Sequence, residues 1–296
     1  MFNRTLIIGT LLIGLFMPGA ASAKLKMAAS TNDLASIANS VGGDQVECIA
    51  IAKPNSDVHR VDVLPSYMVK VSRAQVFLKV GLGLDQWADG IIDGSRNDHL
   101  LVVDCSEGVP VLEKPTGTVT ALMGDVHPFG NPHYWLDPRN GAIIAHNIAE
   151  GLAKVDPEHA EQYRTNAETF AKQTDEAYAR EKATADGLSN RKMITYHRSW
   201  TYLGNAFGIA IVGEAEPVPG IPPTGKHLAE LVGIIKAQKI PLFLQEPYFS
   251  NDAGQFLTRE GGLRVVVMSP SCDSPDAGSY LSHFEQIINA LAKTGS

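Results

Sequence analysis

The sequence predicts an α/β protein of two lobes, each with a mostly parallel sheet, joined by one long helix. Strand-like apolar segments alternate with amphipathic segments through the first half of the chain and again through its last third, which is typical of β-α repeats. Between them, residues 158–188 keep helical spacing of apolar side chains with no glycine or proline before Gly187. The length of 296 residues also exceeds what one hydrophobic core usually supports.

The first repeat supplies an N-terminal lobe, expected over residues 24–156. Its strands are predicted at residues 26–29, 46–52, 76–80 and 100–104, and its helices at residues 32–41, 65–72 and 84–92. Pro65 stands in the first turn of its helix, where a missing backbone N–H costs nothing. Residues 116–132, rich in glycine, proline and threonine, are expected to form a loop.

The second half begins with helices. One is predicted at residues 142–154, and the next, residues 158–188, would reach roughly 45 Å at 1.5 Å per residue. A helix of this length is expected to bridge the lobes over residues 157–188. The C-terminal lobe, residues 189–296, is predicted to contain strands at 193–196, 209–213, 242–244 and 264–268 and helices at 201–207, 225–238, 252–260 and 278–292.

The N-terminus predicts export. Arg4 belongs to a short positive region, Leu6–Met17 form an apolar run too short to span a bilayer comfortably, and residues 21–23 read A-S-A, a typical cleavage site. We expect residues 1–23 to be a cleavable signal peptide and the mature chain to start at Lys24. Since no cysteine lies at the cleavage site itself, we expect a periplasmic protein without a lipid anchor.

Composition narrows the classes of partner. The mature chain carries 24 basic and 32 acidic residues, a formal charge of −8, and no basic run, which argues against nucleic acid and anionic lipid. The three cysteines, Cys48, Cys105 and Cys272, match no zinc-ligand spacing. One disulfide plus a free thiol is compatible with this odd number, and the sequence does not assign the pairing.

Three histidines, His59, His133 and His197, each lie in a loop beyond an apolar segment, and Glu246 ends a further strand-like segment. Ligands bind beyond the carboxyl ends of strands in open α/β sheets, so these side chains could converge in one crevice. Three imidazoles and a carboxylate suit a borderline divalent metal, zinc first. Taken singly, His59 also fits a surface loop and His197 a hydrogen-bonded core histidine.

One motif carries a family resemblance. Residues 131–138 read N-P-H-Y-W-L-D-P, which resembles the N-P-H-x-W-L-D-P signature of the cluster A-I, ZnuA/TroA-like solute-binding proteins of zinc and manganese ABC importers. Supporting matches lie at residues 65–66, 81–87, 196–202 and 246–250. The resemblance implies two α/β lobes bridged by a long helix, with metal held between them by His59, His133 and His197. Manganese-selective relatives tend to carry Glu at the position of His197, so the histidine favours zinc.

The resemblance leaves several candidates for the fourth ligand. Many relatives supply an aspartate from the loop after the last strand, where this chain has Ser269. Glu246 is our first choice, with an outer role of hydrogen-bonding a ligand imidazole as its alternative. Asp273, Asp57 or water are the other candidates. His127 and Asp125 lie in the 116–132 loop, but one histidine does not make a histidine-rich recruiting loop.

Together these features predict a periplasmic, monomeric, high-affinity receptor that binds a divalent metal, zinc in first place and Mn²⁺ or Fe²⁺ otherwise. It would deliver the metal to the membrane permease of an ABC importer, whose ATPase is a separate chain because no G-x-x-x-x-G-K-[ST] loop occurs here. The alternatives are a periplasmic metallochaperone and a receptor for iron or manganese. A zinc hydrolase is less favoured because the sequence lacks H-E-x-x-H, and we expect no enzyme activity.

Overall fold

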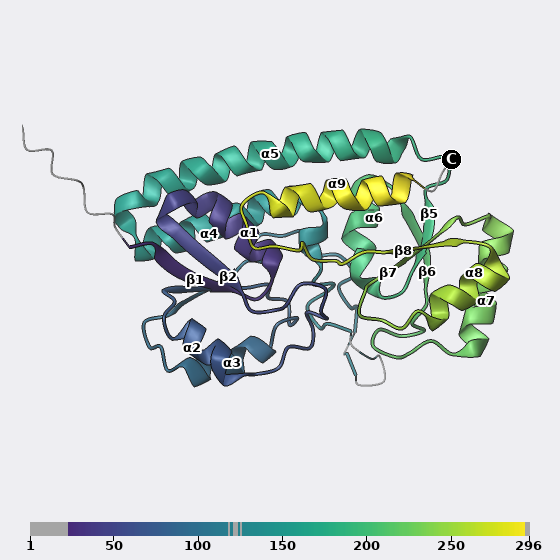
Figure 1. Cartoon of the computed structure of the whole chain (residues 1–296), viewed down its shortest axis with the longest axis horizontal. Coiled ribbons are helices and arrows are strands. Elements are labelled where there is room, and N and C mark those ends of the chain that lie inside the picture. Colours follow the sequence, from purple (N-terminus) through teal and green to yellow (C-terminus); the bar gives the residue numbers. More distant parts are fainter. Residues whose placement is uncertain (1–22, 118, 121–123, 125, 294–296) are drawn as a thin grey trace, which may run out of the picture.

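The computed structural model describes residues 23–117, 119–120, 124 and 126–293. Residues 1–22, most of the predicted signal peptide, and Asp125 lie outside the described residues. The described chain forms two α/β lobes side by side, with one long helix lying along both (Figure 1). This arrangement confirms the predicted fold class. No helix among the described residues is both long and apolar enough to cross a membrane.

The N-terminal lobe is a four-stranded parallel sheet of order β2-β1-β3-β4. Its elements are β1 (Leu25–Ala29), α1 (Asn32–Gly42), β2 (Val46–Ala50), α2 (Pro65–Val71), β3 (Val76–Lys79), α3 (Trp87–Ser95) and β4 (Leu101–Asp104). Helix α1 begins at a Thr31 cap, whose side chain accepts a hydrogen bond from the N–H of Leu34. Helices α2 and α3 bury Tyr67 and Ile91 in a cluster separate from the main core.

The C-terminal lobe repeats the pattern with a parallel sheet of order β6-β5-β7-β8. Its elements are β5 (Lys192–Thr195), α6 (Thr201–Phe207), β6 (Ala210–Glu214), α7 (Gly225–Gln238), β7 (Leu242–Gln245), α8 (Asp252–Gly261), β8 (Arg264–Val267) and α9 (Ser279–Ala292). In each lobe, the strand that comes second along the chain (β2 or β6) lies at one edge of the sheet, and the strand that comes first (β1 or β5) pairs with two neighbours. The two lobes therefore place corresponding loops at corresponding strand ends.

Helices α4 (Pro138–Val155) and α5 (Ala160–Asp186) connect the lobes. Helix α5 has 27 residues, about 40 Å at the usual rise, and runs over both lobes (Figure 1). Its Asn166 side chain donates to the carbonyl of Val41 in the N-terminal lobe at 2.7 Å, and the hydroxyl of Tyr178 donates to Ala206 in the C-terminal lobe at 3.2 Å. The helix is thus hydrogen-bonded to both lobes.

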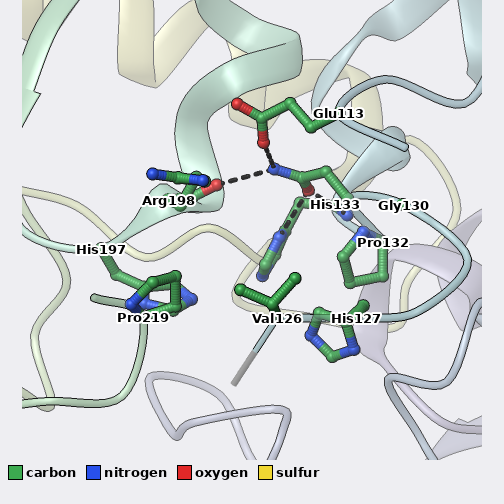
Figure 2. Close-up of a pocket in the computed structure, with 10 residues that line it drawn as sticks. Glu113, Val126, His127, Gly130, Pro132, His133, His197, Arg198 and Pro219 are labelled. Carbon is green, nitrogen blue, oxygen red and sulfur yellow. Dashed lines mark hydrogen bonds between the residues drawn. The ribbon is translucent and has the colours of Figure 1, made fainter. Parts of the chain in front are cut away.

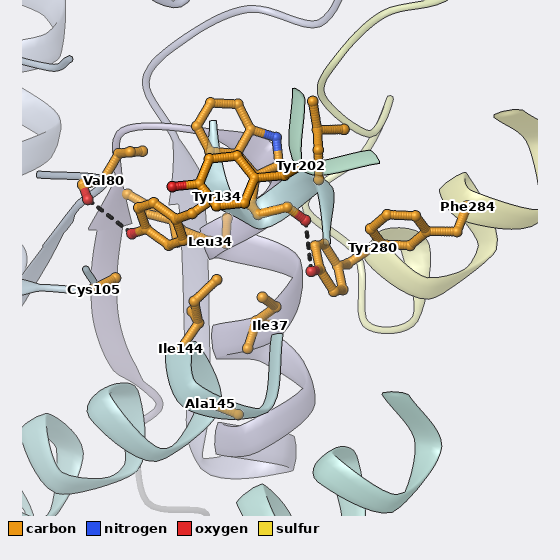
Figure 3. Packing of buried hydrophobic residues seen from close by; sticks show 14 of the residues in the cluster. Leu34, Ile37, Val80, Cys105, Tyr134, Ile144, Ala145, Tyr202, Tyr280 and Phe284 are labelled. Carbon is orange, nitrogen blue, oxygen red and sulfur yellow. Dashed lines mark hydrogen bonds between the residues drawn. The ribbon is translucent and has the colours of Figure 1, made fainter. Parts of the chain in front are cut away.

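One hydrophobic core runs through both lobes. It combines Leu34 and Ile144 from the N-terminal half with Leu244 and Phe284 from the C-terminal half, all nearly inaccessible to solvent. Figure 3 shows the phenol of Tyr280, from α9, reaching toward the N-terminal half, where its hydroxyl donates to the carbonyl of Trp135 at 2.7 Å. The lobes are therefore joined by packed side chains as well as by chain connections.

Two predicted helix boundaries are wrong, and each error has a local cause. The helix expected from residue 84 begins at Trp87, because the carboxylate of Asp85 accepts hydrogen bonds from the N–H groups of Val80 and Gly81 and holds a turn there. The helix expected from residue 142 begins four residues earlier, at Pro138, because the side chain of Asp137 caps it by accepting from the N–H of Arg139.

The predicted long helix, residues 158–188, is slightly shorter. It starts at Ala160, after a 3-10 turn at Pro157–His159, and ends at Asp186. The three cysteines are buried and form no disulfide within the described part of the chain. Burial raises the pKa of Cys48 and of Cys272, so both thiols stay protonated at neutral pH.

Candidate metal centre

Three histidine side chains from the two lobes meet in one place. His59 lies in the loop after β2, His133 precedes a short turn at Tyr134–Leu136, and His197 follows β5 with Tyr196 between them. One potential ligand nitrogen from each lies within 4.8 Å of the other two. Their ring centroids are 5.0 Å apart for His59 and His133, 5.3 Å for His59 and His197, and 5.7 Å for His133 and His197. The spacing lets one ion contact all three rings.

Each ring is oriented through its Nδ1. The Nδ1 of His59 lies 2.9 Å from Asp57 Oδ1, that of His133 lies 2.9 Å from Asn131 Oδ1, and that of His197 lies 2.6 Å from Glu216 Oε2. These three contacts involve side-chain oxygens. An oxygen partner fixes the tautomer with the proton on Nδ1, which leaves Nε2 with an unshared electron pair that can bind a metal ion. The Nε2 atoms of His59 and His133 are buried and lack a hydrogen-bond partner among the described residues.

The loops that carry His59 and His133 share one hydrogen-bonding pattern. In each, the side-chain oxygen of an Asp or Asn accepts hydrogen bonds from both the backbone N–H and the Nδ1 of the histidine two residues later. The backbone bonds are 2.9 Å for Asp57 and 3.0 Å for Asn131. From the sequence, Asp57 is predicted only as an alternative ligand, and Asn131 has no predicted role. The signal that could have found both is an Asx residue two positions before a candidate histidine.

Burial and charge set the protonation of these rings. Burial lowers the pKa of His133 well below its ordinary value, and the neighbouring His59, His197 and His127 rings act in the same direction. His133 is therefore neutral, as a metal ligand must be. For His197, burial also acts to lower the pKa, but the hydrogen bond that its Nδ1 makes to the Glu216 carboxylate, together with the charge of Glu246, raises it.

Glu246 follows β7, as predicted, but lies outside the three-histidine group. It is fully buried, and its Oε1 accepts a hydrogen bond from the hydroxyl of Ser199 at 2.7 Å. Burial raises its pKa to about 7, although His197 and Ser199 act in the opposite direction. Its role as fourth ligand stays a prediction. Of the alternatives, Asp273 is exposed and Asp57 is engaged with His59.

A fourth imidazole adjoins the group. The ring of His127 stacks on that of His59, with centroids 5.3 Å apart and planes inclined by 28°. Figure 2 shows His127, His133 and His197 around one small cavity of about 40 Å³, which Val126 and Pro219 also line. We gave His127 no role from the sequence because it is isolated within a long loop.

A second cavity, of about 190 Å³, reaches the other side of the histidines. Both lobes line it: Asp57, His59, Arg60, Tyr196, His197, Glu216, Gly220, Pro222, Tyr248 and Phe249. Aromatic rings enclose the centre, since Trp135 packs against His133 at 5.3 Å and Phe249 against His197 at 6.1 Å. Three oriented, mostly desolvated imidazole nitrogens between two cavities form a site suited to a borderline divalent cation.

Comparison with known proteins agrees with this chemistry. The chain is similar to the iron-binding protein YfeA of Yersinia pestis, at 26% identity over 93% of this chain and 88% of that protein. It is also similar to the zinc uptake protein ZnuA of Brucella abortus, at 32% identity over 55% of this chain and 48% of that one. A crystal structure of ZnuA shares the fold, with a TM-score of 0.81 and 23% identity over 93% of this chain and 100% of that chain.

A family model spans nearly the whole described chain. Residues 27–294 match the model described as the periplasmic component A of the zinc-uptake complex, ZnuA. The match includes all three histidines, both sheets and the bridging helix α5. The chain therefore belongs to the ZnuA family of periplasmic zinc-uptake components.

Proposed function

We propose that this protein is an extracytoplasmic receptor that captures a divalent metal ion between its lobes and delivers it to the permease of an ABC importer. The observation that carries the proposal is the convergence of His59, His133 and His197, whose ligand nitrogens lie within 4.8 Å of one another. Membership of a solute-binding family supports binding and release over catalysis. The ATPase would be a separate subunit, and the receptor would work as a monomer.

Zinc is the metal that this donor set favours. Neutral imidazoles suit zinc, whereas manganese prefers carboxylate, carbonyl and water oxygens. His197 supplies nitrogen from the C-terminal lobe, and Glu246, our first choice of carboxylate from the sequence, accepts a hydrogen bond from Ser199 through one oxygen. The names of the relatives include zinc-, iron- and manganese-binding proteins, so iron and manganese are the alternatives that a measurement must separate.

Binding would tie the lobes together. His59 and His133 belong to the N-terminal lobe and His197 to the C-terminal lobe, so one ion bonded to all three closes a bridge across the interface. The predicted signal peptide supports a periplasmic location, where such a receptor meets its cargo and its permease. Opening of the lobes by the permease would lengthen the bond to His197 first.

A competition titration tests the proposal. Metal-free protein would be titrated with zinc, manganese and ferrous iron against a chromophoric chelator, with wild type, His133→Ala and the control His99→Ala, whose side chain is exposed. We expect one zinc per chain, displaced by neither manganese nor iron, with affinity lost in His133→Ala and kept in the control. Equal zinc binding by wild type and His133→Ala would refute the site.

A further inference from the structure

The three-histidine group leaves one side of a tetrahedral ion without a protein ligand. Structural zinc takes four ligands, and a three-ligand site must recruit a fourth from solvent or from the chain. Glu246 lies outside the three-histidine group: its Oε1 accepts a hydrogen bond from Ser199, and its buried Oε2 has no hydrogen-bond partner among the described residues. The carboxylate of Asp57 contacts His59. Ser269, which stands where relatives carry an aspartate, accepts a hydrogen bond from the N–H of Ser271 through its hydroxyl.

We propose that His127 supplies the fourth ligand and that the site is a four-imidazole centre. The inference rests on the proposed function, since it concerns the same ion. His127 is placed for this role by its stacking on His59, at a centroid distance of 5.3 Å, which is as short as the distance between His59 and His197. It lies outside the group of three, so its ring must turn toward the ion when zinc binds.

The cavity lining supports the assignment. His127 lines the same cavity as His133 and His197, and at about 40 Å³ that cavity exceeds the roughly 10–15 Å³ needed to hold a group of the size of a water molecule. His127 Nε2 is buried, so turning the ring toward the ion requires little further desolvation. The two rings also interact electrostatically, because His127 is among the groups that lower the pKa of His133.

The backbone around His127 holds it at the meeting point of the lobes. Its carbonyl accepts a hydrogen bond from the N–H of Gly130 at 3.2 Å, which closes a turn. Gly124, at φ +69°, approaches the C-terminal lobe so closely that a Cβ there would lie 2.2 Å from the carbonyl oxygen of Pro219. Gly83 lies close to the ring, since a Cβ there would be 3.9 Å from the Nδ1 of His127.

A four-imidazole centre has a chemical consequence. With no carboxylate bound to the ion, the site favours zinc over manganese and ferrous iron more strongly than a site with an oxygen ligand would. Three of the four ligands, His59, His127 and His133, would also come from the N-terminal lobe. The ion would then bind first to that lobe, and its bond to His197 would link it to the C-terminal lobe.

X-ray absorption at the zinc edge counts the imidazoles directly. The full chain would be loaded with zinc alone, as wild type, His127→Ala and His127→Phe, with His99→Ala as control. The phenylalanine variant keeps an aromatic ring against His59 but has no nitrogen to bind the ion. We expect four imidazoles in wild type and in His99→Ala, and three plus water in both His127 variants. Zinc affinity should fall by at least about tenfold in both, the lower bound for outer-shell changes.

Three imidazoles in the wild type would overturn the assignment, as would an unchanged affinity in His127→Ala. Wild-type affinity in His127→Phe would also overturn it, because stacking on His59 would then be the whole role of the ring. Failure of the proposed function looks different: wild type would not bind zinc, or His133→Ala would bind it as tightly as wild type. Thermal unfolding of the metal-free variants verifies that each one folds.

Discussion

Oε2 of Glu216 lies 2.6 Å from the Nδ1 of His197 and also accepts a hydrogen bond from the backbone N–H of Gly220 at 3.0 Å. One carboxylate oxygen thus connects a candidate metal ligand to the proline-rich loop that covers the centre. Gly220 lines the larger cavity beside the histidines. The positions of His197 and of this loop therefore depend on the same carboxylate oxygen.

Glu216→Gln should weaken zinc binding about ten- to a hundredfold, as loss of a charged partner to a ligand imidazole usually does. The amide keeps the size of the side chain but removes the negative charge that makes the ring a better donor. Glu214→Gln is the matched control, because the Glu214 carboxylate lies 3.7 Å from Arg198 and not against a ligand. Chelator competition measures both. Equal affinities in the two variants would contradict this role for Glu216.

Zinc affinity should fall as the pH is lowered, because imidazoles must lose their protons to bind. The pKa of His197 is raised above its ordinary value of about 6.5, so the fall should begin above that pH, whereas His133, with its lowered pKa, stays neutral to lower pH. Titrations between about pH 8 and 5 measure it. In Glu216→Gln the midpoint should move to lower pH, and a midpoint that does not move would argue against His197 as the titrating group.

Glu246→Gln should stabilise the metal-free protein at alkaline pH. The carboxyl has a pKa of about 7 in the fold against 4.5 in the unfolded chain, so the folded state holds the proton longer and stability falls as the pH rises between those values. Because glutamine does not titrate, the free energy of unfolding of the variant should exceed that of wild type by on the order of 3 kcal/mol above pH 7. Below pH 4.5 the difference should be small. Urea unfolding at both pH values measures the difference.

The same variant tests Glu246 as a ligand. The amide oxygen can still accept the hydrogen bond from Ser199, so the pocket keeps its shape. If His127 is the fourth ligand, zinc affinity should stay close to that of wild type. A loss comparable to that of His133→Ala would instead place Glu246 on the ion.

Zinc should raise the unfolding temperature, because it binds only the folded arrangement of His59, His133 and His197. At free zinc about a thousandfold above Kd the gain is about 4 kcal/mol, or roughly 10 °C for a chain of this size. Calorimetry with zinc and then with excess chelator measures it. His133→Ala should show almost no shift, and a full shift in that variant would locate the stabilising ion elsewhere.

The sequence predicted the fold class and brought three of the site residues together for physical reasons. Apolar segments with β-α alternation place the strand ends at one edge of each sheet, so His59 and His197, which follow strands of different sheets, could converge where these edges meet. His133 was identified through the motif at residues 131–138. These inferences need only the order of the elements, which hydrophobic patterning carries well.

Side-chain direction could not be predicted in the same way. Glu246 does follow its strand, but whether it meets the ion depends on the hydroxyl of Ser199, 47 residues earlier, which binds one of its oxygens. His127 lies in a loop without periodicity, so only the folded chain shows that it stacks on His59. The early start of α4 depends likewise on one cap, Asp137.

The hydrophobic core shared by the lobes limits how this protein can signal that it is loaded. Leu34 and Phe284 belong to one packed cluster, and α5 is hydrogen-bonded at Val41 and at Ala206, so a wide hinge motion would have to tear apart close-packed surface. Empty and loaded molecules must then have almost the same outline. A membrane partner that distinguishes them has to recognise the few loops around the histidines, because only their local surface can differ between the empty and the loaded protein.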